Sequence, residues 1–125
     1  MRSLLLSLML IAALFLNAQQ SKQIAEAFKA GDAISLTNHF SSSVELNLPK
    51  HKGIFQKDQA KMILKEFFEL YPPKSFELKH KGGSERKSRF EIGKLKSGPR
   101  EFRTYLFYNS VGGNVQIIEL RIEEE

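Results

Sequence analysis

The chain has 125 residues, with 19 Lys and Arg against 14 Asp and Glu, and a formal net charge of +5. This length accommodates one domain around one hydrophobic core and excludes two independent domains. The sequence contains no cysteine, which excludes disulfides, cysteine nucleophiles and thiolate metal sites, so burial of the core must stabilise the domain.

The first 18 residues have the pattern of a signal peptide. After a positively charged start, apolar and small residues run without interruption from Leu4 to Leu16. This length is typical of the hydrophobic region of a signal peptide and too short to span a bilayer. The small residue Ala18 predicts cleavage before Gln19, export to the periplasm or beyond the cell, and no stable membrane span after processing. Residues 19–125 would then form a single mature domain. The alternative is an uncleaved anchor.

Two short helices and a strand are predicted after the cut. Apolar residues recur at helical spacing, and Gly31 is placed to end the first helix as a C-cap residue. Asp32 is the expected N-cap of a second helix that runs to Phe40. Alternating apolar and polar residues then predict a half-buried strand over 44–48, which Pro49 stops.

The clearest helical pattern runs from about Lys57 to Leu70. Its apolar positions recur every three or four residues, while lysines and glutamates occupy the other face, as in a helix with one buried side. Pro72-Pro73 ends the helix, because proline disfavours helical geometry in the residue before it. The residues expected to be buried are Ala60, Ile63, Leu64, Phe67, Phe68 and Tyr71.

Four strands are predicted in the rest of the chain, at 76–81, 89–95, 101–109 and 114–123, with glycine-containing turns between them. Gly93 interrupts the alternation of its strand, which suggests a β-bulge there. Helices followed by an antiparallel meander indicate an α+β domain. The expected turns contain Gly82-Gly83, Gly98 and Gly112-Gly113. In each of the last two strands, alternate residues should share one face: Phe102, Thr104, Leu106 and Tyr108 in the first, and Ile118, Leu120 and Ile122 in the second.

Several segments together resemble a known family. They are Gly53-Ile54-Phe55-Gln56-Lys57, Lys65-Glu66-Phe67-Phe68, Tyr71-Pro72-Pro73-Lys74-Ser75-Phe76, His80-Lys81-Gly82-Gly83-Ser84, Phe90-Glu91-Ile92-Gly93-Lys94-Leu95, Phe102-Arg103-Thr104-Tyr105 and Glu119-Leu120-Arg121-Ile122-Glu123. On these residues the mature chain resembles the DUF4783 family of small exported bacterial proteins, a domain of unknown function. The resemblance implies the nuclear-transport-factor-two-like (NTF2-like) or cystatin-like cone fold, in which helices pack on a curved antiparallel sheet and leave a pocket at its wide end. It implies no reaction, because this fold carries enzymes, ligand binders and interaction domains.

The histidines are the first candidates for chemistry. His39, His51 and His80 do not have the spacing of a helical or hairpin metal site, so no metal, cofactor or catalytic residue is assigned. By alternation, His80 continues the face of Phe76 and Leu78, toward the helices or the cone pocket. It is therefore a candidate ligand-binding residue or, alternatively, the general base of a small isomerase or dehydratase. The simplest interpretation is a histidine at the edge of the core.

The last two strands contribute three more candidates for ligand binding. Arg103 and Tyr105 share one strand face, and Arg121 shares a face with Glu119 in the next strand. One strand register would pair Arg103 with Glu119 as a cross-strand ion pair. The functional alternative is that Arg103 and Arg121 clamp an anion or a carbohydrate, with Tyr105 as a stacking surface or, in an enzyme, as a polarising group.

Positive charge concentrates between residues 74 and 103, which contain ten basic and four acidic residues. Such a cluster is typical of nucleic-acid binding, but export argues against that partner and favours a solvated face or weak contact with acidic glycans and lipid head groups. The sequence thus favours a non-catalytic module of the bacterial envelope, which binds a small molecule, a glycan or an envelope protein, over an enzyme. A homodimer through the sheet is a further hypothesis, with Tyr105, Phe107 and Ile117 as an apolar patch.

Overall fold

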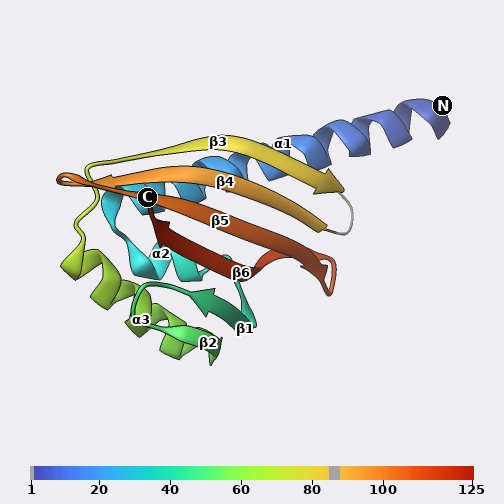
Figure 1. Cartoon of the computed structure of the whole chain (residues 1–125). Coiled ribbons are helices and arrows are strands. Elements are labelled where there is room, and N and C mark those ends of the chain that lie inside the picture. Colours follow the sequence, from blue (N-terminus) through green and yellow to red (C-terminus); the bar gives the residue numbers. More distant parts are fainter. Residues whose placement is uncertain (1, 85–87) are drawn as a thin grey trace.

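The structure, a computed structural model, describes residues 2–84 and 88–125. Its helices are α1 (Arg2–Ala30), α2 (Ala33–Thr37) and α3 (Lys57–Leu70), and its strands are β1 (Phe40–Asn47), β2 (Lys52–Gln56), β3 (Ser75–Ser84), β4 (Ser88–Ser97), β5 (Arg100–Val111) and β6 (Asn114–Glu124). The strands form one sheet in the order β2-β1-β6-β5-β4-β3, antiparallel throughout except between β1 and β6. The curved sheet packs against the helices on one face (Figure 1), which confirms the predicted α+β class.

The helix α1 has an exposed part and a buried part. Its first part projects beyond the sheet (Figure 1), and Leu4 and Leu16 are 66% and 65% exposed. Its second part packs on β3 and α2 and buries Ile24 and Phe28 completely. An 18-residue stretch of this helix has a mean hydropathy of 1.6, so by length and composition α1 could cross a membrane, as a signal sequence near an N-terminus also could. Gly31, with φ of 62°, follows the helix in the left-handed conformation expected of a C-cap residue.

The other helices begin where the sequence predicts. Asp32 caps α2: its Oδ1 accepts a hydrogen bond of 3.0 Å from the Ser35 backbone N–H, and its Oδ2 accepts one of 2.6 Å from the Ser35 hydroxyl. These bonds lower the pKa of Asp32. The helix ends at Thr37 rather than at Phe40, because Phe40 starts β1. α3 has the predicted bounds, whereas β2 was not predicted, because this edge strand has no buried residue to give an alternating pattern.

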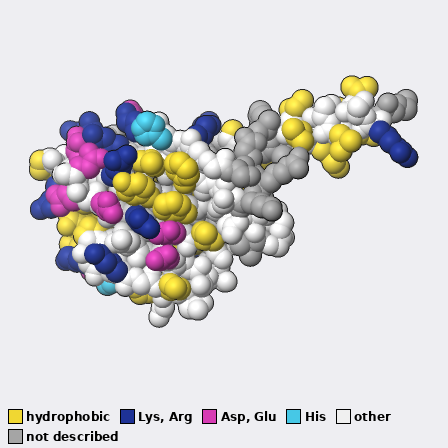
Figure 2. Space-filling model, turned by 45° about the vertical axis from the view of Figure 1, so that its right-hand side comes forward, with side chains coloured by type: hydrophobic (Ala, Val, Ile, Leu, Met, Phe, Trp, Pro, Cys, Tyr) yellow, Lys and Arg dark blue, Asp and Glu magenta, His cyan; other side chains and the backbone are white. Residues whose placement is uncertain are grey.

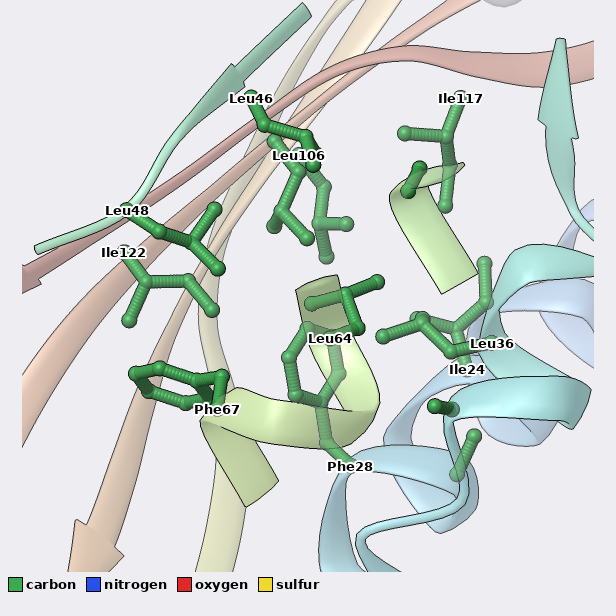
Figure 3. Packing of buried hydrophobic residues seen from close by; sticks show 14 of the residues in the cluster. Ile24, Phe28, Leu36, Leu46, Leu48, Leu64, Phe67, Leu106, Ile117 and Ile122 are labelled. Carbon is green, nitrogen blue, oxygen red and sulfur yellow. The ribbon is translucent and has the colours of Figure 1, made fainter. Parts of the chain in front are cut away.

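The core lies between the sheet and the three helices (Figure 3). Phe28 of α1 stacks on Phe76 of β3 with ring centres 4.4 Å apart, and Phe67 of α3 meets Phe102 of β5 edge to face at 5.5 Å. Phe67, Phe68 and Leu106 all belong to this core, so the centre of the cone is filled with side chains.

A register shift lies on β3, opposite the position where the sequence suggests a bulge. Gly93 pairs with Leu78, the next pair is His80 with Ile92, and Lys79 is the additional residue. Gly93 itself is needed for another reason. A Cβ atom there would lie 2.6 Å from the Phe76 ring, so glycine allows that ring to pack directly on β4.

A second register shift lies on β6, between the pairs Tyr108–Ile117 and Phe107–Glu119. Ile117 is therefore completely buried and Ile118 is not, so the prediction that Ile117 shares an apolar surface patch with Tyr105 and Phe107 is wrong. The predicted turns at Gly98 and Gly112 are confirmed, with φ of 55° and 58°. Residues 82–83, expected in a turn, lie instead inside β3.

Candidate functional site

The four predicted ligand-binding residues lie on the outer face of the sheet, away from the helices. His80 pairs with Ile92, Ile92 with Tyr105, and Tyr105 with Arg121, so three of the four predicted residues lie in one row across four strands. Arg103, the fourth, lies two positions before Tyr105 on β5. His80 is exposed, and the prediction that it shares the inner face of Phe76 is wrong, because the additional residue Lys79 reverses the alternation. On the face shown in Figure 2, hydrophobic side chains gather among charged ones.

The arginines of this outer face are held by neighbouring side chains. Arg103 pairs with Glu123 in the register of β5 and β6, so the predicted pairing with Glu119 is wrong. Glu119 instead accepts a hydrogen bond of 2.7 Å from Nε of Arg121, and this bond raises the pKa of Arg121. The guanidinium of Arg103 also lies 5.4 Å from the centre of the Tyr105 ring. The row lies on an open surface, and its histidine, His80, is exposed rather than facing an enclosed volume.

A different polar group lies on the inner face, at the end of the sheet next to the middle of α1. Arg89 and Glu91 point inward from β4, in register with Tyr108 and Leu106 of β5. The Arg89 guanidinium lies 4.1 Å from the centre of the Tyr108 ring, and its Nη2 is 3.7 Å from Oε1 of Glu91. Charged side chains are seldom placed in a protein interior, where desolvation costs several kcal/mol per ion.

Three side-chain oxygens in this region are buried without a hydrogen-bond partner among the described residues: Glu91 Oε1, Thr104 Oγ1 and Tyr108 Oη. Glu91 and Tyr108 are each 1% exposed, and Thr104 is 0% exposed. Burial, and then the charge of Glu91, raise the pKa of the Tyr108 phenol well above its usual range. A buried polar group without a hydrogen bond costs about 1–3 kcal/mol. Three such oxygens are unusual, because most buried polar atoms in proteins have a hydrogen-bond partner.

Gln20 of α1 connects this site to the rest of the domain. Its Oε1 accepts a hydrogen bond of 3.1 Å from Nη2 of Arg89, and its Nε2 donates one of 2.9 Å to the backbone carbonyl of Val115. The same Nε2 lies 3.4 Å from Nδ1 of His39. Burial, and then the positive charge of Lys57, lower the pKa of His39.

Two open hollows flank α1 beside this site. One, of about 400 Å³, is lined by Asn17, Ala18 and Ser21 of α1 and, among residues of β3 and β4, by Lys81, Arg89 and Glu91. The other, of about 590 Å³, is lined by Asn17, Gln20, His39 and Val115 among others. Glu91 is therefore a buried carboxylate that lines an open hollow.

The sequence contained a signal for this inner site. Arg89, Glu91, Gly93 and Leu95 are every second residue of one strand and therefore share one face, and Leu95 is a core residue. An acidic and a basic residue at inward positions of one strand indicate either a buried ion pair or a binding site.

In the described part of the chain, no group of three His, Asp or Glu side chains could hold a metal ion.

The family model described as Domain of unknown function (DUF4783) matches residues 21–123. Among solved structures, a DUF4783 family protein from Bacteroides uniformis has a TM-score of 0.78 and 26% identity, over 83% of this chain and 95% of that one. A DUF4783 family protein from Bacteroides ovatus has a TM-score of 0.77 and 26% identity, over 82% of this chain and 93% of that one. None of the curated proteins matches this chain.

More distant structures show the fold alone. A domain of unknown function with a cystatin-like fold from Nostoc punctiforme has a TM-score of 0.70 at 9% identity, over 91% of this chain and 78% of that one. An NTF2-like protein of unknown function from Silicibacter pomeroyi has a TM-score of 0.64 at 12% identity, over 95% of this chain and 98% of that one. The expected cone fold is thereby confirmed.

Proposed function

Since the chain belongs to the DUF4783 family and has the NTF2-like fold, we propose that it is an exported binding domain of the bacterial envelope, which holds a small polar ligand at Arg89, Glu91 and Tyr108. One observation carries this proposal: the buried carboxylate of Glu91 lines an open hollow, and its Oε1, 3.7 Å from Nη2 of Arg89, has no hydrogen-bond partner among the described residues. A ligand in the hollow would supply the missing partner.

The chemistry of these side chains defines the class of ligand. A carboxylate accepts hydrogen bonds, a guanidinium donates them, and a phenol can do both. A molecule that carries several hydroxyl or amino groups, such as a sugar or another polyol, would donate to Glu91 and accept from Arg89. The site thus supports the small-molecule or glycan partner over an extended protein surface as the occupant of this hollow.

Binding is favoured over catalysis by the position of the titratable groups. A small isomerase or dehydratase needs a base that faces an enclosed substrate. His80 is exposed on the outer face, so we assign it no catalytic role. The Glu91 carboxylate lies 3.7 Å from Nη2 of Arg89, which also donates a hydrogen bond to Gln20, so it is the ion-pair partner of a guanidinium that is itself held in place.

Export is supported by the exposed part of α1. Figure 2 shows hydrophobic side chains uncovered along the projecting helix, and Met9 is 75% exposed. Such a surface is unfavourable in water, and removal of residues 1–18 as a signal peptide would eliminate it. Placement in the periplasm or outside the cell follows from this processing.

The outer face of the sheet is a second candidate surface, for a homodimer or an envelope protein. Ile54 of β2 is 74% exposed and Phe90 of β4 is 36% exposed, and Tyr105 and Phe107 lie between these strands in the sheet. Apolar side chains within a charged surface are common in interfaces. Sedimentation of the purified chain at several concentrations would detect such a dimer.

The binding function can be tested with the intact domain. We expect native mass spectrometry of gently purified protein, or thermal melts with a panel of neutral and acidic sugars, to reveal a bound ligand. The stabilisation should disappear in Glu91→Gln and persist in Glu101→Gln, a matched change in an exposed ion pair with Lys94. Stabilisation that survives Glu91→Gln unchanged would refute this site.

A further inference from the structure

We infer that Gln20 is the positioning residue that holds Arg89 in the candidate site, and that protonation of His39 releases this hold. The inference rests on the proposed function, because it concerns the regulation of the same site. Mild acid would then act on Arg89 from the neighbouring hollow, through the side-chain amide of Gln20.

The amide of Gln20 has one orientation that satisfies its neighbours. Nη2 of Arg89 lies 3.1 Å from Oε1 of Gln20, and a guanidinium can only donate a hydrogen bond. The backbone carbonyl of Val115 lies 2.9 Å from Nε2 of Gln20, and a carbonyl can only accept one. Both contacts fix the amide oxygen toward Arg89 and the amide nitrogen away from it, and a reversed amide would lose both hydrogen bonds.

The orientation of this amide dictates the state of His39. Nδ1 of His39 lies 3.4 Å from Nε2 of Gln20, which is a donor, so Nδ1 has to be the acceptor. The ring is therefore neutral in this arrangement, with its proton on the other nitrogen. Protonation would add a hydrogen to Nδ1, and two donors would then face each other.

The backbone of His39 is fixed, so Gln20 has to respond to the protonation. The N–H of His39 donates to the carbonyl of Leu36 at 3.1 Å, and its carbonyl accepts from the N–H of Ile117 at 2.7 Å. Gln20, in contrast, meets His39 with a long side chain that is only half-buried. When its amide turns away from the imidazolium, Arg89 loses the hydrogen bond that connects it to α1.

The charged groups around His39 place this response in mild acid. Burial, and then the positive charge of Lys57 on α3, lower the pKa of His39. Glu26 of α1 and Asp32, the N-cap of α2, line an open hollow of about 510 Å³ together with His39. Asp32 stays charged in this range, because its hydrogen bonds to Ser35 lower its pKa. Histidine is the side chain that ordinarily titrates just below neutral pH.

Nuclear magnetic resonance of the full chain in detergent micelles can follow both ends of this connection. The sequence contains three histidines, so their ring signals can be resolved, and His39→Gln identifies the signal of His39. Arg89→Lys identifies the Nε–H signal of Arg89 in the same way. Gln23→Ala is the matched control for Gln20→Ala, because Gln23 lies on the same helix and lines two hollows together with His39.

We expect Gln20→Ala to raise the affinity of His39 for a proton about threefold to tenfold, the equivalent of one hydrogen bond, and Gln23→Ala to leave it unchanged. In the unchanged chain, the Arg89 signal should shift with the same midpoint as the His39 ring, and this shift should be absent from Gln20→Ala. If Gln20→Ala does not fold, Gln20→Glu keeps an acceptor for Arg89 and offers another to the imidazolium. That change should raise the proton affinity of His39 about tenfold or more.

Four results would each overturn the inference. They are a proton affinity of His39 that the Gln20 substitutions do not change, an equal rise in Gln23→Ala, an Arg89 signal that does not respond when His39 titrates, and a neutral His39 ring with its proton on Nδ1. Long-range proton–nitrogen spectra of the histidine rings distinguish the two neutral forms.

These measurements need no ligand, so their outcome is separable from that of the proposed function. Coupling between His39 and Arg89 in a protein for which the sugar panel finds no ligand would support the role of Gln20 and count against the binding function. A sugar that binds equally tightly before and after His39 takes up its proton would support the binding function and overturn the inference.

Discussion

The guanidinium of Arg89 lies over the ring of Tyr108, with 4.1 Å between its carbon and the ring centre. Cation–π contacts of this kind are worth about 0.5–2 kcal/mol, more when water is excluded. In this position Arg89 also lies 3.7 Å from Glu91 and donates to Gln20. One side chain thereby connects α1 to the two strands that form the candidate site.

Removal of Arg89 should destabilise the domain. Arg89→Met leaves Glu91 buried without its cation, and breaking a buried ion pair costs about 3–5 kcal/mol. Urea unfolding followed by circular dichroism would measure the loss. The matched change Arg103→Met, on the exposed outer face, should leave the midpoint nearly unchanged. Adding Glu91→Leu to Arg89→Met should restore much of the stability, and an additive double variant would contradict the pairing.

The two buried threonines should respond in opposite directions to the same substitution. The Thr104 hydroxyl has no partner among the described residues, so Thr104→Val should stabilise the domain by about 1 kcal/mol. The Thr37 hydroxyl donates to the carbonyl of Ala33 at 2.8 Å, so Thr37→Val should destabilise it by about 1 kcal/mol. Thermal melts of both variants decide the matter, and a destabilised Thr104→Val would mean that its hydroxyl is bonded.

Phe67 should be essential to the core. Phe67→Ala removes a ring that packs on Phe102 at 5.5 Å and should cost about 3–5 kcal/mol. In a domain without disulfides, such a loss would leave much of the protein unfolded at body temperature. Met62→Ala on the same helix, at a side chain 62% exposed, is the control and should change the melting temperature little.

Stability should fall in mild acid because of His39. Burial and the charge of Lys57 place its pKa in the folded protein below the ordinary value of 6.5. The unfolded chain therefore binds the proton more tightly, so the free energy of unfolding decreases as the pH falls below 6.5 and continues to decrease down to the folded pKa. Denaturation at several pH values between about 5 and 8 should show a smaller decrease for His39→Gln than for the unchanged chain. An identical decrease would contradict this.

Processing after Ala18 is open to direct measurement. Amino-terminal sequencing of protein from the bacterial envelope should begin at Gln19, because the apolar run has the length of a signal-peptide core and the small residue Ala18 follows it directly before the predicted cut. A chain that begins at Met1 in the cytoplasm would refute both the cleavage and the proposed location.

The elements of the fold were predictable where the periodicity of the sequence was unbroken. α3 has its predicted bounds, and Asp32 caps α2 as expected. The strand faces were predictable only up to the next register shift. The additional residue Lys79 turns His80 outward, and the shift near Ile118 places Ile117 in the core. Such a shift depends on how neighbouring strands pack on each other, for example on the close contact of the Phe76 ring with Gly93. The sequence of one strand alone does not contain this information.

The candidate site was harder to predict than the fold. His80, Arg103, Tyr105 and Arg121 were chosen because polar residues interrupt apolar strands, and three of them do lie in one cross-strand row. The row is on the outer face, however, and the buried polar group consists of Arg89, Glu91 and Tyr108. Gln20 could not be found from the sequence, because its importance depends on contacts with residues 69 and 95 positions away.

The position of β6 has a consequence for how the chain acquires its structure. β6 is the last strand in the sequence but an interior strand of the sheet, with β5 on one side and β1 on the other. The hairpin of β1 and β2 therefore has no neighbour in the sheet until residues 117–121 are available, and pairing over such a sequence distance is slow. A ribosome-bound or partly translocated chain cannot complete this sheet. Completion of the sheet therefore depends on the synthesis of residues 117–121, even though the pairings among β3, β4 and β5 do not involve them.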